Sequence, residues 1–392
     1  MAWNRTGAEQ RQSIGIPQST KADAATKLIN LQVLRALAAL SVVVAHAIHE
    51  TENLATVTTR QAVDASAWYL GYGVDIFFVL SGFIMMHTAA AEFGKNGASL
   101  RFFLRRCARV VPLYWLLTSI MLLGAAVAPS LLNVPVGDFS HVVASYLFIP
   151  DMRGVNEVRP VLALGWTLNY EMLFYVLFAL ALMMPIRLGI VWLSVLMAAL
   201  TLVGAMIEPR NVQIAFWTNP IILEFLFGVY VALIFRSGLR IGTGIALALM
   251  AVGLIGFARF STPWDDAALP QFLRRGVPAA VFVLAAAIGP ALPVKRIVLW
   301  GVALGDASYS LYLAHPFVVR PMRAMWAKAI DDHLSLGLFV IYATFGSIIF
   351  ALALFRIVEK PLTAYVQELG CNPKRKTEKQ FPGVRPSDVE SR

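Results

Sequence analysis

A long apolar stretch covers residues 31–48, with the sequence LQVLRALAALSVVVAHAI, and carries Arg35 and His46 within it. It is long enough to cross a bilayer as a helix. An arginine near the bilayer centre costs about 2.5 to 3.5 kcal/mol even on the most lenient insertion scale, so such residues face protein or water. At about 100° per residue, the step from Arg35 to His46 closes on roughly three turns, so both side chains leave one face, displaced by about 16 Å along the axis. We therefore expect the rest of the chain to form a bundle around that face.

The composition is that of a multi-pass membrane protein. Of the 392 residues, 58% are hydrophobic and 14% are charged, and the mean hydropathy is +0.67. Soluble domains of this size do not approach such values. The net charge of +10 does not indicate nucleic acid, because the basic residues lie mainly in the N-terminal region, the short loops and the C-terminal tail, where the positive-inside rule places them. The two cysteines are far apart in the sequence, which argues against a disulfide framework or a cysteine-based metal site.

About ten apolar segments have roughly the 17 to 25 residues that a membrane helix needs. These segments cover residues 31–48, 70–90, 110–128, 164–184, 188–207, 219–235, 241–257, 277–292, 297–319 and 336–357. The most basic loops fall on one side of the bundle, which predicts that this side and both termini are cytoplasmic. The predicted fold is therefore an all-α integral membrane protein, a polytopic bundle of about ten transmembrane helices. Residues 28–361 form its membrane domain, and residues 1–27 and 362–392 are expected to be disordered cytoplasmic tails.

Four ionisable residues are predicted to lie in the outer half of the membrane: His46, Asp75, Glu171 and His315. Asp75 is placed about one turn below the outer surface, where its carboxylate could hold His46 in one tautomer and stabilise the protonated imidazole. A plain interhelical hydrogen bond would explain Asp75 equally well. Glu171 is embedded in its segment, and an embedded glutamate marks a functional site by default. Glu224 is a second embedded acid, for which the sequence offers no partner.

Aromatic and polar residues with a binding role are expected beside these groups. Trp166 and Tyr175 lie on either side of Glu171 in WTLNYEMLFY, and Tyr312 and His315 share one helical stripe in GDASYSLYLAHPF. These four residues are candidates for binding a hydroxylated substrate. Packing in the aromatic belt of a membrane interface is the competing explanation for Trp166 and the tyrosines.

An arginine cluster, Arg105, Arg106 and Arg109, stands at the inner mouth of the third segment. Membrane topology alone accounts for basic residues at a cytoplasmic helix end. Forked guanidiniums also suit phosphates, so together with Arg35 the cluster could dock an anionic cytoplasmic cofactor. The chain contains no GxxxxGK loop, no HExxH and no CxxC pair, so the sequence predicts neither ATP-driven nor zinc chemistry.

Several motifs occur in a fixed order along the chain. Arg35 and His46 are separated by ten residues, and EKP closes the membrane region at 359–361. Between them lie GVDIFFVLSGF at 73–83, RRCARVVPLYW at 105–115, WTLNYEMLFY at 166–175 and GDASYSLYLAH at 305–315. No single block is decisive, but the ordered set resembles the membrane acyltransferase-3 family over roughly residues 28–361.

The resemblance implies an integral-membrane enzyme of the bacterial plasma membrane. Such an enzyme takes an acyl group, usually acetyl from cytoplasmic acetyl-CoA, and delivers it to a hydroxyl of an extracytoplasmic or lipid-linked glycan, with exopolysaccharide the favoured acceptor here. By this resemblance His46 is the essential histidine, Arg35 its motif partner, Arg106 and Arg109 the RxxR pair near the donor, and Glu171 the embedded glutamate. The implied partners are the glycan acceptor, membrane lipid and polysaccharide-assembly proteins, with no metal and no nucleic acid.

The chemistry fits the residues independently. A sugar hydroxyl that attacks a thioester needs a base, and an imidazole beside a carboxylate can supply one. His46 is predicted to be that base, or to carry the acyl group briefly, with Asp75 or Glu171 orienting it. The arginines would hold the phosphates of the cofactor at the inner mouth.

Two other classes of protein stay open. A proton-coupled secondary transporter also uses about ten helices with embedded His, Glu and Arg residues, and it would show inverted repeats and broken helices, which the sequence does not reveal. A non-catalytic component of a polysaccharide export assembly would leave the pairing of Arg35 and His46 unexplained. Transfer of label from acetyl-CoA would separate the enzyme from both.

Overall fold

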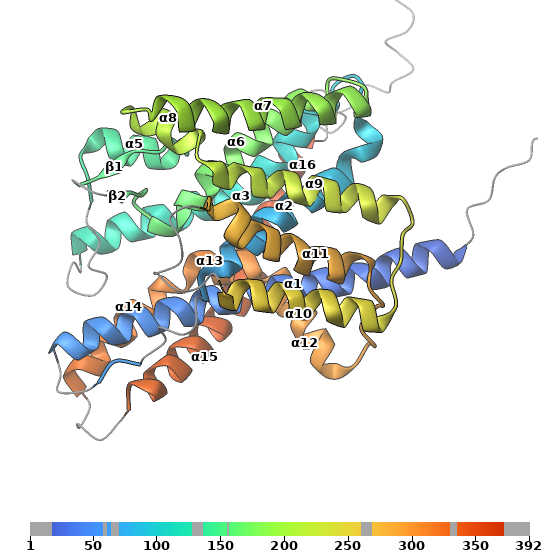
Figure 1. Ribbon diagram of the computed structural model, residues 1–392. Helices are drawn as coiled ribbons and strands as arrows, with labels where there is room; N and C mark the ends of the chain where they lie inside the picture. Colours follow the sequence, from blue (N-terminus) through green and yellow to red (C-terminus); the bar gives the residue numbers. More distant parts are fainter. Residues whose placement is uncertain are drawn as a thin grey trace, which may run out of the picture.

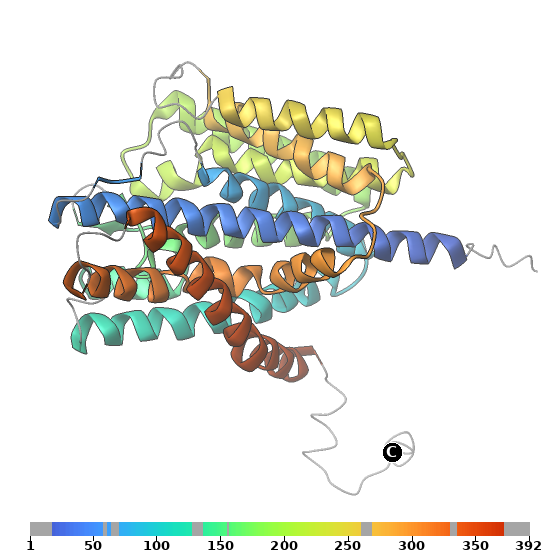
Figure 2. The same ribbon diagram turned by 90° about the horizontal axis from the view of Figure 1, so that it is seen from below.

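Long helices that run in roughly one direction make up almost the whole molecule (Figures 1 and 2). The computed structural model describes residues 18–57, 61–63, 70–127, 136–154, 157–259, 269–329 and 335–371. Its α-helices are α1 (Gln18–Val57), α2 (Gly73–Ala89), α3 (Ala98–Val127), α5 (Phe139–Tyr146), α6 (Trp166–Ala181), α7 (Ile186–Ile207), α8 (Val212–Trp217), α9 (Leu223–Arg236), α10 (Thr243–Arg259), α11 (Val277–Ile288), α12 (Arg296–Asp306), α13 (Ser308–Ala314), α14 (Pro316–Ala329), α15 (Leu336–Leu354) and α16 (Lys360–Cys371). Short 3-10 or π-helical turns adjoin them, namely η1 (Leu70–Tyr72), η2 (Ala90–Glu92), η3 (Ala163–Gly165), η4 (Pro220–Ile222), η5 (Phe272–Gly276) and η6 (Phe355–Glu359). Within the described ranges the only strands are β1 (Met152–Arg153) and β2 (Glu157–Val158), which pair antiparallel. The predicted all-α fold is confirmed.

The longest of these helices, α1, is the element around which the others gather. It has 40 residues, and at a rise of about 1.5 Å per residue it is about 60 Å long. It contacts α2, α11, α12, α13, α14 and α15. The helix begins at Gln18, within the segment that was expected to be a disordered tail, and residues 1–17 lie outside the described residues. At the other end of the chain, α16 likewise extends into the expected C-terminal tail as far as Cys371.

Fewer helices than expected have both the length and the apolar composition of a membrane span. Seven helices in the described residues are long and apolar enough: Ile29–Thr56, Leu70–Glu92, Ala98–Val127, Ala163–Ala181, Ile186–Ile207, Val212–Arg236 and Leu336–Leu369. The pair α12 and α13 would make an eighth span, bent by 58° at its break. Two further expected spans correspond to shorter helices, α10 with 17 residues and α11 with 12. Seven or eight helices of the described residues thus have the length and composition of a span, and the expected number of about ten stays a prediction.

The segment at 297–319, expected as one span, is divided among three helices. Ala307 separates α12 from α13 with φ −84° and ψ 6°, and His315 separates α13 from α14. Pro316 begins α14, a position that suits a residue with a fixed φ and no backbone N–H. The breaks turn α13 into the interior, where all but one of its residues are buried.

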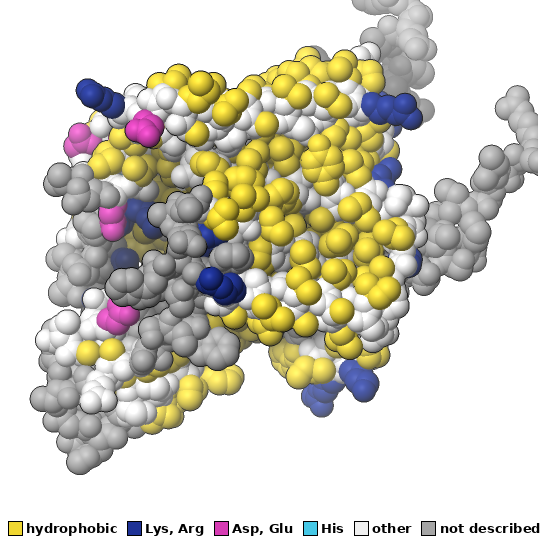
Figure 3. Space-filling view, in the orientation of Figure 1, with side chains coloured by type: hydrophobic (Ala, Val, Ile, Leu, Met, Phe, Trp, Pro, Cys, Tyr) yellow, Lys and Arg dark blue, Asp and Glu magenta, His cyan; other side chains and the backbone are white. Residues whose placement is uncertain are grey.

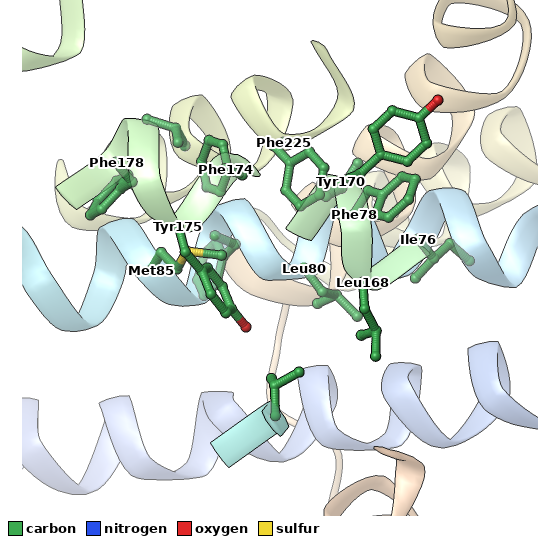
Figure 4. Packing of buried hydrophobic residues seen from close by; sticks show 14 of the residues in the cluster. Ile76, Phe78, Leu80, Met85, Leu168, Tyr170, Phe174, Tyr175, Phe178 and Phe225 are labelled. Carbon is green, nitrogen blue, oxygen red and sulfur yellow. The ribbon is translucent and has the colours of Figure 1, made fainter. Parts of the chain in front are cut away.

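The backbones of α2 and α9 approach closely. A Cβ atom on Gly82 would stand 1.9 Å from the carbonyl oxygen of Phe225, and one on Gly228 would stand 1.9 Å from that of Val79. Small residues let membrane helices meet at their backbones and gain van der Waals contact. Beside this crossing Phe225 stacks on Phe174, with ring centroids 4.6 Å apart (Figure 4). The crossing therefore fixes α2 in the core of the bundle.

Charge distinguishes the two ends of the bundle. On the face seen in Figure 3, Lys and Arg side chains without acidic neighbours mark the end where α1 begins, and both signs of charge mark the other end. Between them the surface is mainly apolar, and α7 exposes Leu188, Val191, Val195 and Leu202. An apolar belt between a basic end and a mixed end is what the positive-inside rule leads us to expect of a membrane protein. These two ends are called the basic end and the mixed end below.

Candidate functional site

Two cavities lie along α1, one beside Arg35 and the other beside His46. The first, the inner cavity, has a volume of about 100 Å³ and is lined by residues of α1, α2, α3, α6 and α13. The second, the outer cavity, has a volume of about 260 Å³ and is lined mainly by α1, α14 and the segment that leads into α6. Arg35 and His46 were expected to face a single cavity, and the structure places them in two.

Arg35 ties α1 to the break between α12 and α13. Its guanidinium donates hydrogen bonds to Gln32 Oε1 at 3.0 Å and to Ser308 Oγ at 2.9 Å. The Gln32 amide in turn donates to Asp306 Oδ1 at 2.8 Å. The arginine is thus held in one orientation, with its charge at the wall of the inner cavity.

Glu171, on α6, is the carboxylate of the inner cavity. Its Oε1 accepts hydrogen bonds from Ser81 Oγ at 2.9 Å and from Tyr175 Oη at 2.6 Å. Tyr175 is buried, and its hydroxyl points out of the aromatic cluster (Figure 4). The charges of Arg35 and Arg106 act on this glutamate. Two donors on one oxygen fix the carboxylate and leave its second oxygen for other partners.

Two of the three clustered arginines, Arg106 and Arg109, line the inner cavity. Arg106 donates a hydrogen bond to Thr88 Oγ1 at 2.9 Å. The third, Arg105, is exposed and donates to the carbonyl oxygen of Arg101 at 3.1 Å. The predicted RxxR pair therefore belongs to the cavity, and Arg105 lies outside it.

Glu359 is an acid near the inner cavity that the sequence did not single out as a site residue. It accepts a hydrogen bond from Ser310 Oγ at 2.5 Å, and its charge acts on Arg35. Tyr309, which was also overlooked, lines the cavity and donates to the carbonyl oxygen of Val110 at 2.7 Å. Glu359 lies within the last long apolar helix, and an acid in such a position is the signal that would have identified it.

His46 and His315 form a pair in the outer cavity, with ring centroids 5.0 Å apart and ring planes inclined by 46°. His46 Nδ1 lies 2.9 Å from the carbonyl oxygen of Val42, and His315 Nδ1 lies 3.1 Å from that of Leu311. Because a carbonyl oxygen can only accept, each neutral imidazole carries its proton on Nδ1 and keeps a lone pair on Nε2. His315 is buried, and its Nε2 has no hydrogen-bond partner among the described residues. The pair therefore presents two nitrogens that can act as bases.

The hydroxyl of Tyr312 links residues that line the two cavities. It lies 3.0 Å from Thr167 Oγ1 and donates to the carbonyl oxygen of Leu164 at 3.3 Å. Tyr312 and Thr167 line the inner cavity, whereas Leu164 lines the outer one. These three residues therefore form a shared wall between the cavities, called the Tyr312 wall below.

The predicted pairing of Asp75 with His46 is wrong. Asp75 is buried, accepts a hydrogen bond from Gln271 Nε2 at 3.3 Å, and lies within electrostatic reach of Glu224. Gly73, two residues earlier, faces α1 closely. Positions two residues apart on a helix point about 200° apart, so Asp75 faces away from α1. Glu224, which had no partner in the sequence, is one of the residues that Asp75 meets instead.

Trp166 lines neither cavity, and its ring centroid lies 5.0 Å from the guanidinium carbon of Arg159. Its contact with substrate stays a prediction. Glu171 and His46 line different cavities, so a direct contact between them also stays a prediction. In the part of the chain that the structure describes, no three His, Cys, Asp or Glu side chains gather as they would to hold a metal ion.

Comparison with known proteins confirms the family that the sequence motifs predicted. The family model described as an acyltransferase domain matches residues 28–356. The chain is 34% identical over 300 residues to the exopolysaccharide production protein ExoZ of Rhizobium meliloti (strain 1021), a match that covers 74% of this chain and 88% of that protein. It is 27% identical over 328 residues to the acyltransferase MdmB of Streptomyces mycarofaciens, covering 75% of this chain and 79% of that protein. No solved structure matches the chain. The chain belongs to the membrane acyltransferase-3 family and is therefore an acyltransferase.

Proposed function

We propose that the protein moves an acyl group, in the first instance acetyl, from cytoplasmic acetyl-CoA to a hydroxyl of an exopolysaccharide precursor across the bacterial plasma membrane. The observation that carries the proposal is the pair of cavities on either side of the Tyr312 wall. The inner one holds three arginines, and the outer one holds three histidines, of which His46 and His315 form a pair. This arrangement suits a reaction whose anionic donor and sugar acceptor arrive from opposite ends of the bundle.

The donor would enter from the basic end. Coenzyme A carries phosphates, and a forked guanidinium binds two phosphate oxygens at once. Arg35, Arg106 and Arg109 line the inner cavity and can take this role. His46 lies about 16 Å further along α1. The extended pantetheine arm of the donor can cover such a distance and present its thioester at the Tyr312 wall.

His46 is the base in this reaction. Its Nε2 lone pair takes the proton of the acceptor hydroxyl while the hydroxyl oxygen attacks the carbonyl carbon of the thioester. The carbon–oxygen bond forms, the carbon–sulfur bond breaks, and the departing thiolate takes the proton back from the imidazolium. The hydrogen bond from His46 Nδ1 to the carbonyl oxygen of Val42 keeps the ring in the tautomer that can do this.

The acceptor would arrive at the mixed end. The positive-inside rule directs the basic end to the cytoplasm, which leaves the outer cavity on the opposite side of the membrane. The relative ExoZ is named as an exopolysaccharide production protein, which favours a glycan of an exported polysaccharide as the acceptor. Polysaccharide-assembly proteins in the same membrane would present that glycan.

One observation favours the transporter alternative, because the bend between α12 and α13 makes a broken span of the kind that transporters use. A transporter would move its substrate without forming a covalent product. The two functions therefore differ in whether label from the donor becomes bound to the glycan.

Label transfer in purified protein tests the proposal. Protein in nanodiscs is given radiolabelled acetyl-CoA and lipid-linked glycan extracted from a strain that lacks the protein. We expect the wild type to label the glycan and His46→Gln to transfer label about 10²- to 10⁴-fold more slowly, the usual contribution of a general base. His87→Gln is the matched control, because His87 lies on α2 and lines neither cavity. Uptake of label into sealed vesicles without any labelled glycan would contradict the proposal and favour the transporter.

A further inference from the structure

One stripe of polar side chains on α1 lines the outer cavity. His46, Glu50 and Asn53 stand at positions i, i+4 and i+7, so their side chains leave one face of the helix. At a rise of about 1.5 Å per residue, Glu50 lies about 6 Å beyond His46 along the helix axis. A carboxylate therefore stands one helical turn from the proposed base, and the transfer of the hydroxyl proton to His46 does not use it.

Glu50 is held by one of its two carboxylate oxygens. Arg323 Nη1, on α14, donates a hydrogen bond to Oε2 at 3.0 Å, and Asn53 Nδ2 donates to the same atom at 2.9 Å. No hydrogen bond from the described residues reaches Oε1, although the charge of the carboxylate also acts on Arg320. The side chains of Glu50 and Arg323 are only 14% and 20% exposed, so neighbouring atoms limit their movement. Glu50 thus presents Oε1 in a fixed orientation at the wall of the outer cavity.

An ion pair that only joins α1 to α14 is the competing explanation for Glu50. The two helices are in contact, and the pair of Glu50 and Arg323 does link them. A carboxylate that serves only as a link is best held by a bidentate arginine, whose two parallel N–H groups occupy both oxygens. Here both donors converge on Oε2, at the wall of a cavity that also contains His46. A purely structural link does not account for this arrangement.

The chemistry of the acceptor supplies a partner for Oε1. An ionised carboxylate only accepts hydrogen bonds, and a sugar hydroxyl donates one. Hydrogen bonds to ionised groups are also stronger than those between neutral groups. A sugar carries several hydroxyls, so one can give its proton to His46 Nε2 while another donates to Glu50. The separation of about 6 Å along α1 places both hydroxyls on the same part of the acceptor.

We propose that Glu50 determines which acceptor is acylated: its Oε1 accepts a hydrogen bond from a second hydroxyl of the sugar whose first hydroxyl loses its proton to His46. The inference rests on the proposed transfer of an acyl group to a glycan and deepens it. Arg323 and Asn53 act through Glu50, as positioning residues. The expected acceptor therefore carries a free hydroxyl close to the one that is acylated.

Steady-state transfer of label to lipid-linked glycan tests this contact. The glycan is extracted from a strain that lacks the protein, and the protein is assayed in nanodiscs. Glu50→Gln is expected to raise KM for the glycan about tenfold or more, because a charge-assisted hydrogen bond is lost, and to leave KM for acetyl-CoA within about twofold of the wild type. Glu52→Gln is the matched control, because Glu52 is an exposed glutamate of α1 that pairs with His49 and lines neither cavity.

A double variant separates acceptor binding from a structural link. Glu50→Gln leaves the partly buried Arg323 without its carboxylate, which lowers stability by itself. The double variant Glu50→Gln, Arg323→Gln removes both charges, so its melting temperature is expected to return toward that of the wild type. Its KM for the glycan is expected to stay raised, because the carboxylate is still absent. A purely structural pair would instead regain the wild-type KM together with the melting temperature.

The outcomes separate this inference from the proposed function. A Glu50→Gln enzyme with the wild-type KM for the glycan, or a double variant that regains it, would overturn the contact with Glu50 and leave acyl transfer intact. A KM for acetyl-CoA that rises as much as the KM for the glycan would overturn the contact too. A wild-type enzyme that transfers no label to the glycan would overturn the proposed function, and the inference with it.

Discussion

Removal of the Tyr175 hydroxyl tests whether the Glu171 carboxylate is held in place for catalysis. Tyr175 Oη donates to Glu171 Oε1 at 2.6 Å, and the side chain is only 2% exposed, so water has little access to replace the lost bond. A hydrogen bond to a charged group contributes about 1.5 to 3 kcal/mol. Tyr175→Phe keeps the ring and its packing, so we expect the free energy of unfolding to fall by about this amount. If the transition state needs the same carboxylate orientation, acyl transfer slows roughly 10- to 150-fold, at about 1.36 kcal/mol per tenfold.

Ser81 is the second hydrogen-bond donor to the same carboxylate oxygen. Its Oγ donates to Glu171 Oε1 at 2.9 Å, so it restrains the carboxylate in part after the tyrosine hydroxyl is removed. We therefore expect the double variant Ser81→Ala, Tyr175→Phe to lose more stability and more transfer activity than the sum of the losses in the two single variants. The coupling energy of such a double-mutant cycle lies at about 0.5 to 3 kcal/mol for groups in one network.

The assay combines thermal unfolding in detergent with label transfer from acetyl-CoA. Tyr230→Phe is the control, because it removes a tyrosine hydroxyl that lies 2.8 Å from Ser194 Oγ. Tyr230 is 45% exposed, so water can replace this hydrogen bond, unlike that of the buried Tyr175. We expect this control to change stability by less than about 1 kcal/mol. A Tyr175→Phe enzyme with the melting temperature and transfer rate of the wild type would refute the role given to the Glu171 hydrogen bonds.

Three further predictions concern packing, the donor and metals. Gly228→Leu forces α9 away from the Val79 carbonyl, because a Cβ at this position would approach its oxygen to 1.9 Å. We expect the free energy of unfolding to fall by at least about 1 to 3 kcal/mol, measured by thermal unfolding, and the membrane level to fall on a blot. Arg106→Gln removes a guanidinium from the inner cavity and is expected to raise KM for acetyl-CoA about tenfold or more in the label assay, while the KM for the glycan stays unchanged. EDTA is expected to leave the transfer rate unchanged, and a loss of activity that a divalent cation restores would contradict this.

Hydropathy predicted the kind of fold and failed at the bends. The long apolar stretches predicted the helical bundle, and the loop charges predicted its basic end, because the length and flanking charge of a span are local properties of the sequence. The break at Ala307 is not local, since it depends on how α13 turns into the interior between its neighbours. A sliding window therefore counts 297–319 as one straight helix.

The sequence indicated which residues line the candidate site better than it indicated the direction in which each side chain points. The face shared by Arg35 and His46 was derived from helical geometry, and both do line cavities along α1. The direction in which Asp75 points depends on which side of α2 meets α1. The close approach at Gly73 decides that question, and the sequence does not show it. The pairing of His46 with His315 joins residues far apart in the chain, which periodicity cannot reveal.

The most direct test of the proposed function is the acetyl content of the surface polysaccharide, measured by NMR in a deletion strain complemented with wild-type or His46→Gln protein at equal membrane levels. We expect O-acetyl signals to be lost in the deletion strain, restored by the wild type and not restored by His46→Gln. Full acetylation with His46→Gln would contradict the role of this histidine as the base. Unchanged acetylation in the deletion strain would contradict O-acetylation of this polysaccharide by the protein.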